Sequence, residues 1–177
     1  NEDMKKLREM AICAAEAGPL MQEASVGSAK RYKISELFEP KNDLRSLGLP
    51  IIQWTGKGGY KPTSPEGKFL TTLGLRSFPS PSELVKMMAS QDTDQRVRAL
   101  NYFIKNYEIN GYAQYSLAGA TTPFLPIEGD AKALCTPSTC FSNEKSTLVG
   151  MRLLRRDLVP HAAKFGVAEN PPLLVAV

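Results

Sequence analysis

Residues 64–75, with the sequence SPEGKFLTTLGL, contain the signals for a complete short helix, including both of its ends. Ser64 offers a side-chain oxygen as an N-cap, and Pro65 stands at the first helical position, where its missing N–H is not needed. Gly74 follows one apolar residue and precedes another, which is typical of a helix stop in which glycine takes the left-handed conformation. We therefore predict a helix that begins after Ser64 and ends at Gly74.

The same stop occurs at Leu47-Gly48-Leu49 and at Phe165-Gly166-Val167. In each case an apolar residue closes the last turn, and a second apolar residue follows the glycine. We expect a positive φ at all three glycines, and we expect the residue after each glycine to pack back on its helix. These positions predict how the chain folds, and none of them predicts a ligand.

Two further helices are predicted after residue 75. Ser80 and Glu83 have the spacing of a capping box, and Pro81 stands between them at the first helical position. Residues 93–107 carry apolar side chains at positions 97, 100, 104 and 107, which places these side chains along one side of a helix. Together with residues 64–74, the two segments predict a central three-helix unit.

The remaining segments are shorter and predict an α+β fold. We expect an N-terminal helix over residues 3–16, and a C-terminal helix from a capping Asp157 to Phe165. Extended segments are expected at residues 30–38, 50–54, 123–127, 133–136 and 147–154. The glycine-rich residues 55–64 are the best candidate boundary. We therefore predict an N-terminal helix with a small strand lobe over residues 1–55 and an α+β domain over residues 64–177.

The composition indicates an intracellular protein without a bilayer-spanning segment. The 177 residues suffice for one domain with a small lobe, and no apolar run approaches the ~20 residues that span a bilayer. Three cysteines without framework spacing are typical of reduced thiols, so we expect a cytoplasmic or nuclear location. The chain begins at Asn1 without a charged and apolar leader, which favours a piece of a longer protein.

The sequence contains no set of residues that predicts catalysis, a cofactor or a bound metal. Cys135, Cys140 and His161 are too few and too loosely spaced for a structural zinc site, which needs four ligands. A Cys–His dyad from the same residues would need a contact that nothing in the sequence predicts. Cys13, in the expected N-terminal helix, is interpreted as a small core residue. The segment Gly56-Lys57-Gly58-Gly59 lacks the spacing of a phosphate-binding loop and is interpreted as a flexible loop.

The net charge of +4 is small and its charges are interleaved, so a mixed solvated surface is the simplest interpretation. Three basic groups could still contact phosphate or an acidic partner. The group on the predicted third helix would suit a winged-helix module, in which that helix can enter a DNA groove. Trp54, Tyr112 and Tyr115 could form a partner-binding patch, although burial in the core is the simpler expectation. The candidate interaction residues are Lys30, Arg31, Lys33, Arg96, Arg98, Lys105, Arg152, Arg155 and Arg156.

Several short motifs follow one another in an order that resembles a known family. They are Ser35-Glu36-Leu37-Phe38-Glu39-Pro40, Leu44-Arg45-Ser46-Leu47-Gly48-Leu49-Pro50, Phe69-Leu70-Thr71-Thr72-Leu73-Gly74-Leu75, Phe78-Pro79-Ser80-Pro81-Ser82-Glu83-Leu84, Phe124-Leu125-Pro126, Cys135-Thr136-Pro137, Cys140-Phe141-Ser142 and Lys164-Phe165-Gly166-Val167. This succession resembles the segment that follows the ATPase module in very large sacsin-like and NO VEIN-like proteins. It is most similar to a fungal branch known only as a domain of unknown function, and it covers most of residues 30–175.

The resemblance implies a parent protein with a GHKL-type ATPase. The Asn and Gly boxes that bind nucleotide in that fold are not visible in these 177 residues, so no catalytic residue carries over. We expect a non-catalytic structural or protein-interaction module of a large chaperone-like or scaffold protein. Its partner would be another domain of the parent or another protein, and no membrane partner is expected. The alternatives are a winged-helix-like nucleic-acid-binding module and a cysteine-dependent enzyme.

Overall fold

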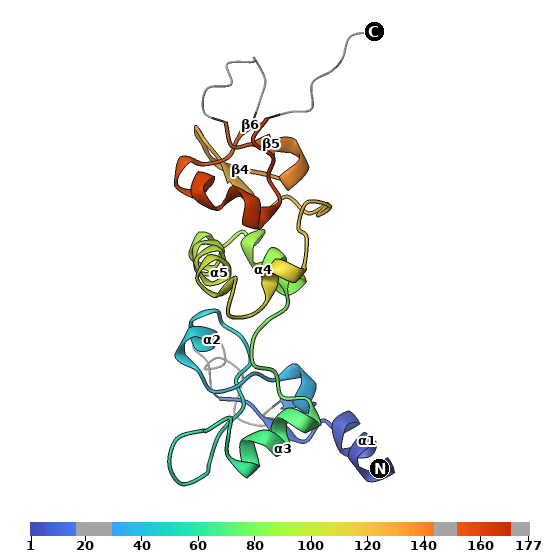
Figure 1. Cartoon of the computed structure of the whole chain (residues 1–177). Helices are drawn as coiled ribbons and strands as arrows, with labels where there is room; N and C mark the ends of the chain where they lie inside the picture. Colours follow the sequence, from blue (N-terminus) through green and yellow to red (C-terminus); the bar gives the residue numbers. More distant parts are fainter. Residues whose placement is uncertain (17–29, 144–151, 171–177) are drawn as a thin grey trace. The chain divides into compact units, whose positions relative to one another are not determined.

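The fold was analysed in a computed structural model that describes residues 1–16, 30–143 and 152–170 (Figure 1). Its contacts divide the chain into two compact units, Asn1–Pro79 and Ser80–Val177. The division therefore lies after Pro79 and not at the predicted boundary in residues 55–64. The α+β class is confirmed, because short helices alternate with small, separate pairs of strands.

The first unit begins with helix α1 (Glu2–Glu9), which is followed by the antiparallel strands β1 (Cys13–Ala14) and β2 (Arg31–Tyr32). The prediction of a helix through residue 16 is wrong, because Met10 has an extended backbone and the chain enters β1 soon after it. Pairing with β2 is a long-range interaction that overrides the helical periodicity of this segment. Cys13 accordingly lies in a strand and not in a helix.

The small sheet of this unit continues through isolated bridges. Ala15 pairs with Ile52, and Phe38 pairs with both Ile51 and Arg76. Between these strands lie the 3₁₀ helix η1 (Ile34–Glu36), helix α2 (Asn42–Ser46) and helix α3 (Pro65–Leu73). The segment at residues 30–38 is thus a two-residue strand followed by a turn. A hydrophobic core of the first unit is formed by Tyr32, Ile34, Leu37, Ile52, Leu73 and Leu75.

Helix α3 has the two ends that the sequence predicts. The Ser64 Oγ accepts a hydrogen bond from the Gly67 N–H at 3.0 Å, and Gly74 has φ 122°. The N–H of Leu75 returns to the Leu70 carbonyl at 2.9 Å, so Leu75 is buried on the core. This burial attaches α3 to η1 and to α1 within Asn1–Pro79. The predicted grouping of this helix with the two that follow is therefore not observed.

The predicted left-handed glycines are confirmed. Gly48 has φ 75° and Gly166 has φ 74°. Val167 is buried and its N–H bonds the Ala162 carbonyl at 3.0 Å, as expected for a residue that packs back on its helix. Leu49 is only half-buried, so the prediction is met less completely at Gly48.

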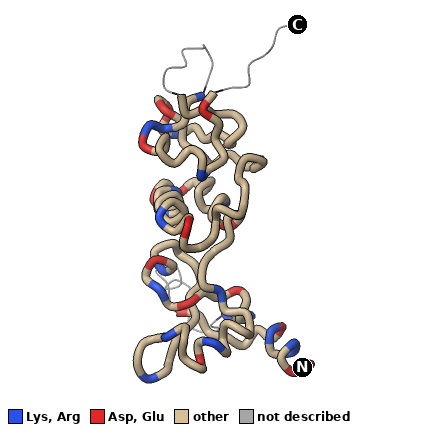
Figure 2. Tube along the Cα trace, viewed as in Figure 1, with Lys and Arg blue, Asp and Glu red and all other residues tan. Residues whose placement is uncertain are grey.

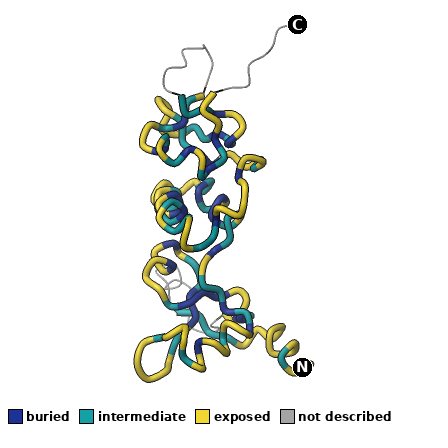
Figure 3. The backbone as a smooth tube through the Cα atoms, viewed as in Figure 1, coloured by how far each residue is buried: buried dark blue, intermediate teal, exposed yellow. Residues whose placement is uncertain are grey.

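The second unit contains α4 (Pro81–Met88) and α5 (Thr93–Asn106), which pack against each other. The predicted capping box is confirmed, since the Ser80 N–H bonds Glu83 Oε2 at 3.0 Å and the Glu83 N–H bonds Ser80 Oγ at 3.3 Å. The predicted apolar stripe of α5, beside which Phe103 is expected, is buried at Leu100 and Phe103, and it is exposed at Val97, whose exposed fraction is 41%. Figure 3 shows that this helix carries both buried and exposed residues.

The rest of this unit consists of short elements around the same core. In chain order they are η2 (Tyr112–Gln114), β3 (Leu125–Ile127), β4 (Asp130–Cys135), η3 (Pro137–Thr139), β5 (Cys140–Phe141), β6 (Arg152–Leu153) and η4 (Arg156–Phe165). β3 and β4 form an antiparallel hairpin, and β5 and β6 are parallel. Most of the predicted extended segment at residues 147–154 lies outside the described residues.

The C-terminal helix differs from its prediction at the start. Arg155 occupies the N-cap position of η4, and Asp157 lies inside the first turn, where it pairs with Arg155. The predicted cap at Asp157 is therefore wrong. The Asp157 carboxylate is held chiefly by its bidentate contact with the Arg155 guanidinium.

Candidate interaction surface

The basic residues predicted to contact a partner fall into separate places. Lys30, Arg31 and Lys33 lie in Asn1–Pro79, and the other six lie in Ser80–Val177. Lys33 Nζ is 2.7 Å from Glu9 Oε2, and Lys30 Nζ lies 4.8 Å from the centre of the Tyr32 ring. Figure 2 shows Lys and Arg interspersed with Asp and Glu along the backbone. The first basic group is thus largely engaged in contacts within its own unit.

The basic residues of α5 differ in their exposure. The Arg96 guanidinium donates to Thr93 Oγ1 at 3.1 Å, whereas Arg98 and Lys105 are exposed. Arg96 also lines a cavity of about 40 Å³ whose wall includes Leu100 and Phe124. A cavity of this volume holds a few water molecules and is far smaller than a site for a metabolite.

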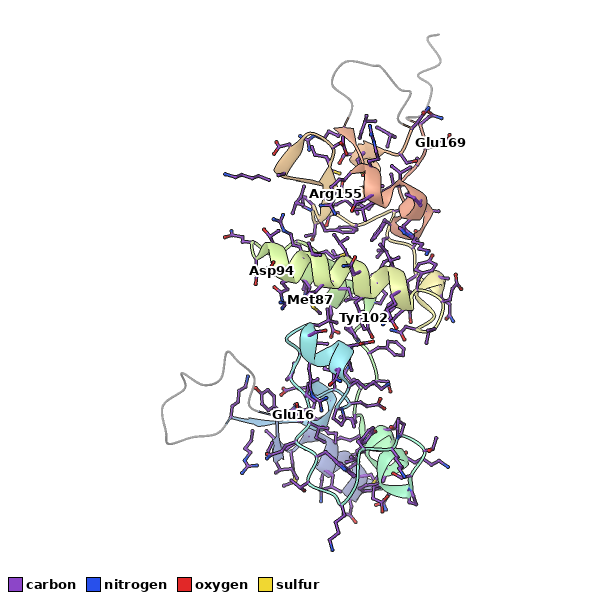
Figure 4. The ribbon with its side chains drawn as sticks, turned by 90° about the vertical axis from the view of Figure 1, so that its left-hand side faces the viewer. Glu16, Met87, Asp94, Tyr102, Arg155 and Glu169 are labelled. Carbon is purple, nitrogen blue, oxygen red and sulfur yellow. The ribbon has the colours of Figure 1, made fainter. Side chains whose placement is uncertain are left out.

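Arg155, which Figure 4 labels, forms a bidentate ion pair with Asp157. Its Nε lies 2.5 Å from Asp157 Oδ1 and its Nη2 lies 2.8 Å from Oδ2, and this bidentate contact lowers the pKa of Asp157. The backbone N–H of Arg156 donates to Glu128 Oε2 at 2.9 Å, and Arg152 is exposed on β6. The predicted role of these arginines in binding stays a prediction.

The cysteine and histidine candidates do not form a catalytic dyad among the described contacts. Cys135 and Cys140 are buried, whereas His161 Nδ1 lies 3.4 Å from Lys164 Nζ on the same helix. Within residues 1–16, 30–143 and 152–170, no group of three or more His, Cys, Asp or Glu side chains could hold a metal ion. No helix among these residues has the length and apolarity needed to cross a bilayer.

The glycine-rich loop is folded around Trp54. Its indole Nε1–H donates to the Gly58 carbonyl at 3.3 Å, and the Trp54 ring meets the Tyr60 ring edge-on at a centroid distance of 5.3 Å. A Cβ at Gly56 would lie 2.7 Å from the Trp54 ring, so the loop backbone approaches the indole closely. Of the other candidate aromatics, Tyr112 is buried and Tyr115 is exposed.

Glu39 is a buried carboxylate that the sequence interpretation missed. Its side chain is 2% exposed, and its Oε1 accepts hydrogen bonds from Ser77 at 3.0 Å and from Tyr60 at 3.4 Å. Its Oε2 lies 2.8 Å from Lys41 Nζ, but at an angle too poor for a directed hydrogen bond. Burial, together with the charge of Glu39, raises the pKa of Tyr60. Glu39 thereby connects the glycine-rich loop to the segment after α3.

Replacing Glu39 by alanine should lower the free energy of unfolding of Asn1–Pro79 by about 2–3 kcal/mol, because Ser77 and Lys41 lose their partner. The exposed Lys41 contributes little of this loss, since water screens its charge. Urea unfolding followed by the fluorescence of Trp54 measures the effect. The control is Glu66→Ala on the exposed first turn of α3, for which we expect a change within about 0.5 kcal/mol. Equal losses in the two variants would contradict this role of Glu39.

The N-terminal helix and the residues that follow it expose an apolar strip. Leu7 in α1 and Met10 and Ile12, which follow the helix, are 38%, 48% and 53% exposed, and we call these three side chains the α1 apolar strip. The helix is attached to its unit through Met4, which packs on the core, and through Arg8 Nη2, which donates to the Thr72 carbonyl at 2.8 Å. Large apolar side chains exposed side by side are typical of surfaces that bind another molecule.

The comparison with known protein families decides the family of the chain. Residues 1–177 match the family described as "Protein of unknown function (DUF3684)". The chain belongs to this family. No curated protein and no solved structure matches the chain. The family description names no reaction, so function has to be argued from the surface and the buried side chains.

Proposed function

We propose that the chain is a non-catalytic structural or protein-interaction module of a large intracellular protein of the scaffold or chaperone-like kind. The observation that carries this proposal is the α1 apolar strip, because Leu7, Met10 and Ile12 expose apolar area that the unit itself does not cover. The sacsin-like motif order in the sequence supports a large multidomain parent. The partner is then a protein surface, either another domain of the parent or a separate chain.

The burial of the reactive side chains supports a binding role over catalysis. An active site is usually a concave pocket that holds titratable side chains, and the cavity beside Arg96 is too small for an organic substrate. The winged-helix alternative needs three helices in one unit, but α3 lies in Asn1–Pro79 while α4 and α5 lie in Ser80–Val177. This division favours a protein partner over nucleic acid.

Position-specific photocrosslinking in cells that express the protein tests the proposal. A benzoylphenylalanine at Leu7 or Met10 should crosslink to a protein, because both side chains are exposed at the end of α1. The matched control is the same probe at Lys5, which is exposed on the same helix but points about 200° away from Leu7. We expect at least a fivefold lower yield at Lys5.

Two outcomes of this experiment would contradict the proposal. Equal yields at Leu7 and Lys5 would mean that the α1 apolar strip has no preferred partner. Crosslinks to nucleic acid, lost at high salt, would favour the winged-helix-like alternative, and substitution of Arg96, Arg98 and Lys105 would then test that role.

A further inference from the structure

Cys135 and Cys140 lie at the two ends of a single tight turn. Cys135 is the last residue of β4, Cys140 is the first residue of β5, and η3 connects them. The turn is closed by Thr136 and Thr139, because the Thr139 N–H donates to the Thr136 carbonyl at 3.1 Å and the Thr136 N–H donates to Thr139 Oγ1 at 3.2 Å. The two thiols lie close enough across this turn for each to influence the ionisation of the other.

The surroundings of the pair distinguish its two thiols. Both side chains are buried, with exposed fractions of 1% and 0%. Arg152 on β6 stands opposite Cys140 in the parallel strand pair. Interaction with the Cys140 thiol, helped by the positive charge of Arg152, lowers the pKa of Cys135, whereas interaction with Cys135, together with burial, raises the pKa of Cys140. Cys135 is therefore the thiol that ionises first and attacks an oxidant.

We propose that Cys135 and Cys140 form a reversible oxidation site whose product is the intramolecular disulfide Cys135–Cys140. The oxidant is a small peroxide such as hydrogen peroxide. The Cys135 thiolate attacks one peroxide oxygen, the O–O bond breaks, and a sulfenic acid and hydroxide form. Cys140 then attacks the sulfenic sulfur, the S–O bond breaks, and the S–S bond forms with release of water. Two thiols give two electrons to one peroxide, and two water molecules result.

The strand pairing provides a route by which a peroxide reaches the buried thiols. Among the described residues, β5 pairs with β6 at Cys140–Arg152 and Phe141–Leu153, and Phe141 also forms a bridge with Ala168. Short strand pairs of this kind open locally at a small cost in free energy. Cys13 lies in the other unit on β1, and its pKa is raised by burial, so it provides an internal comparison thiol.

The experiment uses the whole reduced chain treated with hydrogen peroxide, then alkylated and digested with trypsin. Cleavage after Lys132 and Lys145 leaves both cysteines in one peptide, residues 133–145. We expect this peptide to lose two hydrogen atoms and to escape alkylation, and we expect the three free thiols per chain to fall to one. A reducing dithiol should restore all three thiols.

Two substitutions sharpen the test. Cys13→Ser should leave the oxidised peptide unchanged, and Cys140→Ser should prevent the loss of hydrogen and leave Cys135 with added oxygen. The wild-type peptide mass decides the proposal even where a variant folds poorly. Full alkylation of both cysteines after peroxide treatment, or a disulfide that joins Cys13 to either of them, would overturn the proposal.

Discussion

Replacing Gly166 by alanine should lower the free energy of unfolding of Ser80–Val177 by about 3–5 kcal/mol, because two independent costs coincide at this residue. The backbone has φ 74°, a conformation that L-residues with a side chain rarely adopt. A Cβ at Gly166 would also lie 2.5 Å from the backbone nitrogen of Ala118 and 2.7 Å from its Cα. The clashing atoms belong to the backbone of Ala118, which cannot change rotamer as a flexible side chain can. Either the C-terminal end of η4 or the segment around Ala118 therefore has to shift.

Gly129 provides the matched control in the same unit. It has φ 83° in the turn between β3 and β4, and a Cβ there would meet no atom within 4 Å. Gly129→Ala should therefore cost only the conformational term, about 1–2 kcal/mol. Because the single tryptophan lies in the other unit, the unfolding of Ser80–Val177 is followed by circular dichroism or by amide hydrogen exchange in α5. Equal losses at Gly166 and Gly129 would show that the approach of Ala118 does not matter.

Replacing Phe103 by alanine should destabilise the same unit by about 3–5 kcal/mol, because this ring is the centre of its aromatic core. Phe103 is buried, stacks on Tyr112 at 5.3 Å and on Phe165 at 5.2 Å, and meets Tyr107 edge-on at 5.5 Å. These contacts join α5 to η2 and to η4. The substitution removes the ring and leaves a cavity that its aromatic neighbours cannot fill without changing their own packing.

The control for Phe103 is Val97→Ala on the same helix. Val97 is exposed, so we expect its substitution to change stability by no more than about 0.5 kcal/mol. The helical propensity of alanine is similar or better in both variants, so the difference between them isolates the core contribution. A large loss at Val97 would mean that α5 is also packed at the part of the stripe that is exposed in the structure.

The helix ends could be predicted because their signals are local. The Ser64 and Ser80 caps use a side chain and an N–H three residues away, and the left-handed Gly74 is required by the turn itself. Interactions of this range depend on a few neighbouring residues, which the sequence displays in order.

The assembly of the elements could not be predicted in the same way. α1 ends at Glu9 because β1 pairs with β2 across a long stretch of chain, and α3 joins the first unit because Leu75 fits the core around Ile34. Such choices depend on pairings that local periodicity does not encode. They also decided the division of the chain, which falls after Pro79.

The candidate site was only partly visible in the sequence for the same reason. The basic residues are easy to find, but their partners, such as Glu9 for Lys33, come from elsewhere in the fold. Glu39 stands in the sequence without a local partner, and its hydrogen bonds come from Tyr60 and Ser77, which lie 21 and 38 residues further along the chain. The sequence spacing of Cys135 and Cys140 does not predict that the two residues lie at the two ends of one turn, because that turn is formed by η3.

The central claim is that this chain acts by binding a protein and not by catalysis. The most direct test is a calorimetric titration of the purified chain with Mg·ATP, combined with an assay of phosphate release. We predict no binding heat at micromolar nucleotide and no phosphate release above the buffer rate. Saturable ATP binding at micromolar concentration, or hydrolysis that follows the chain through purification, would contradict the account.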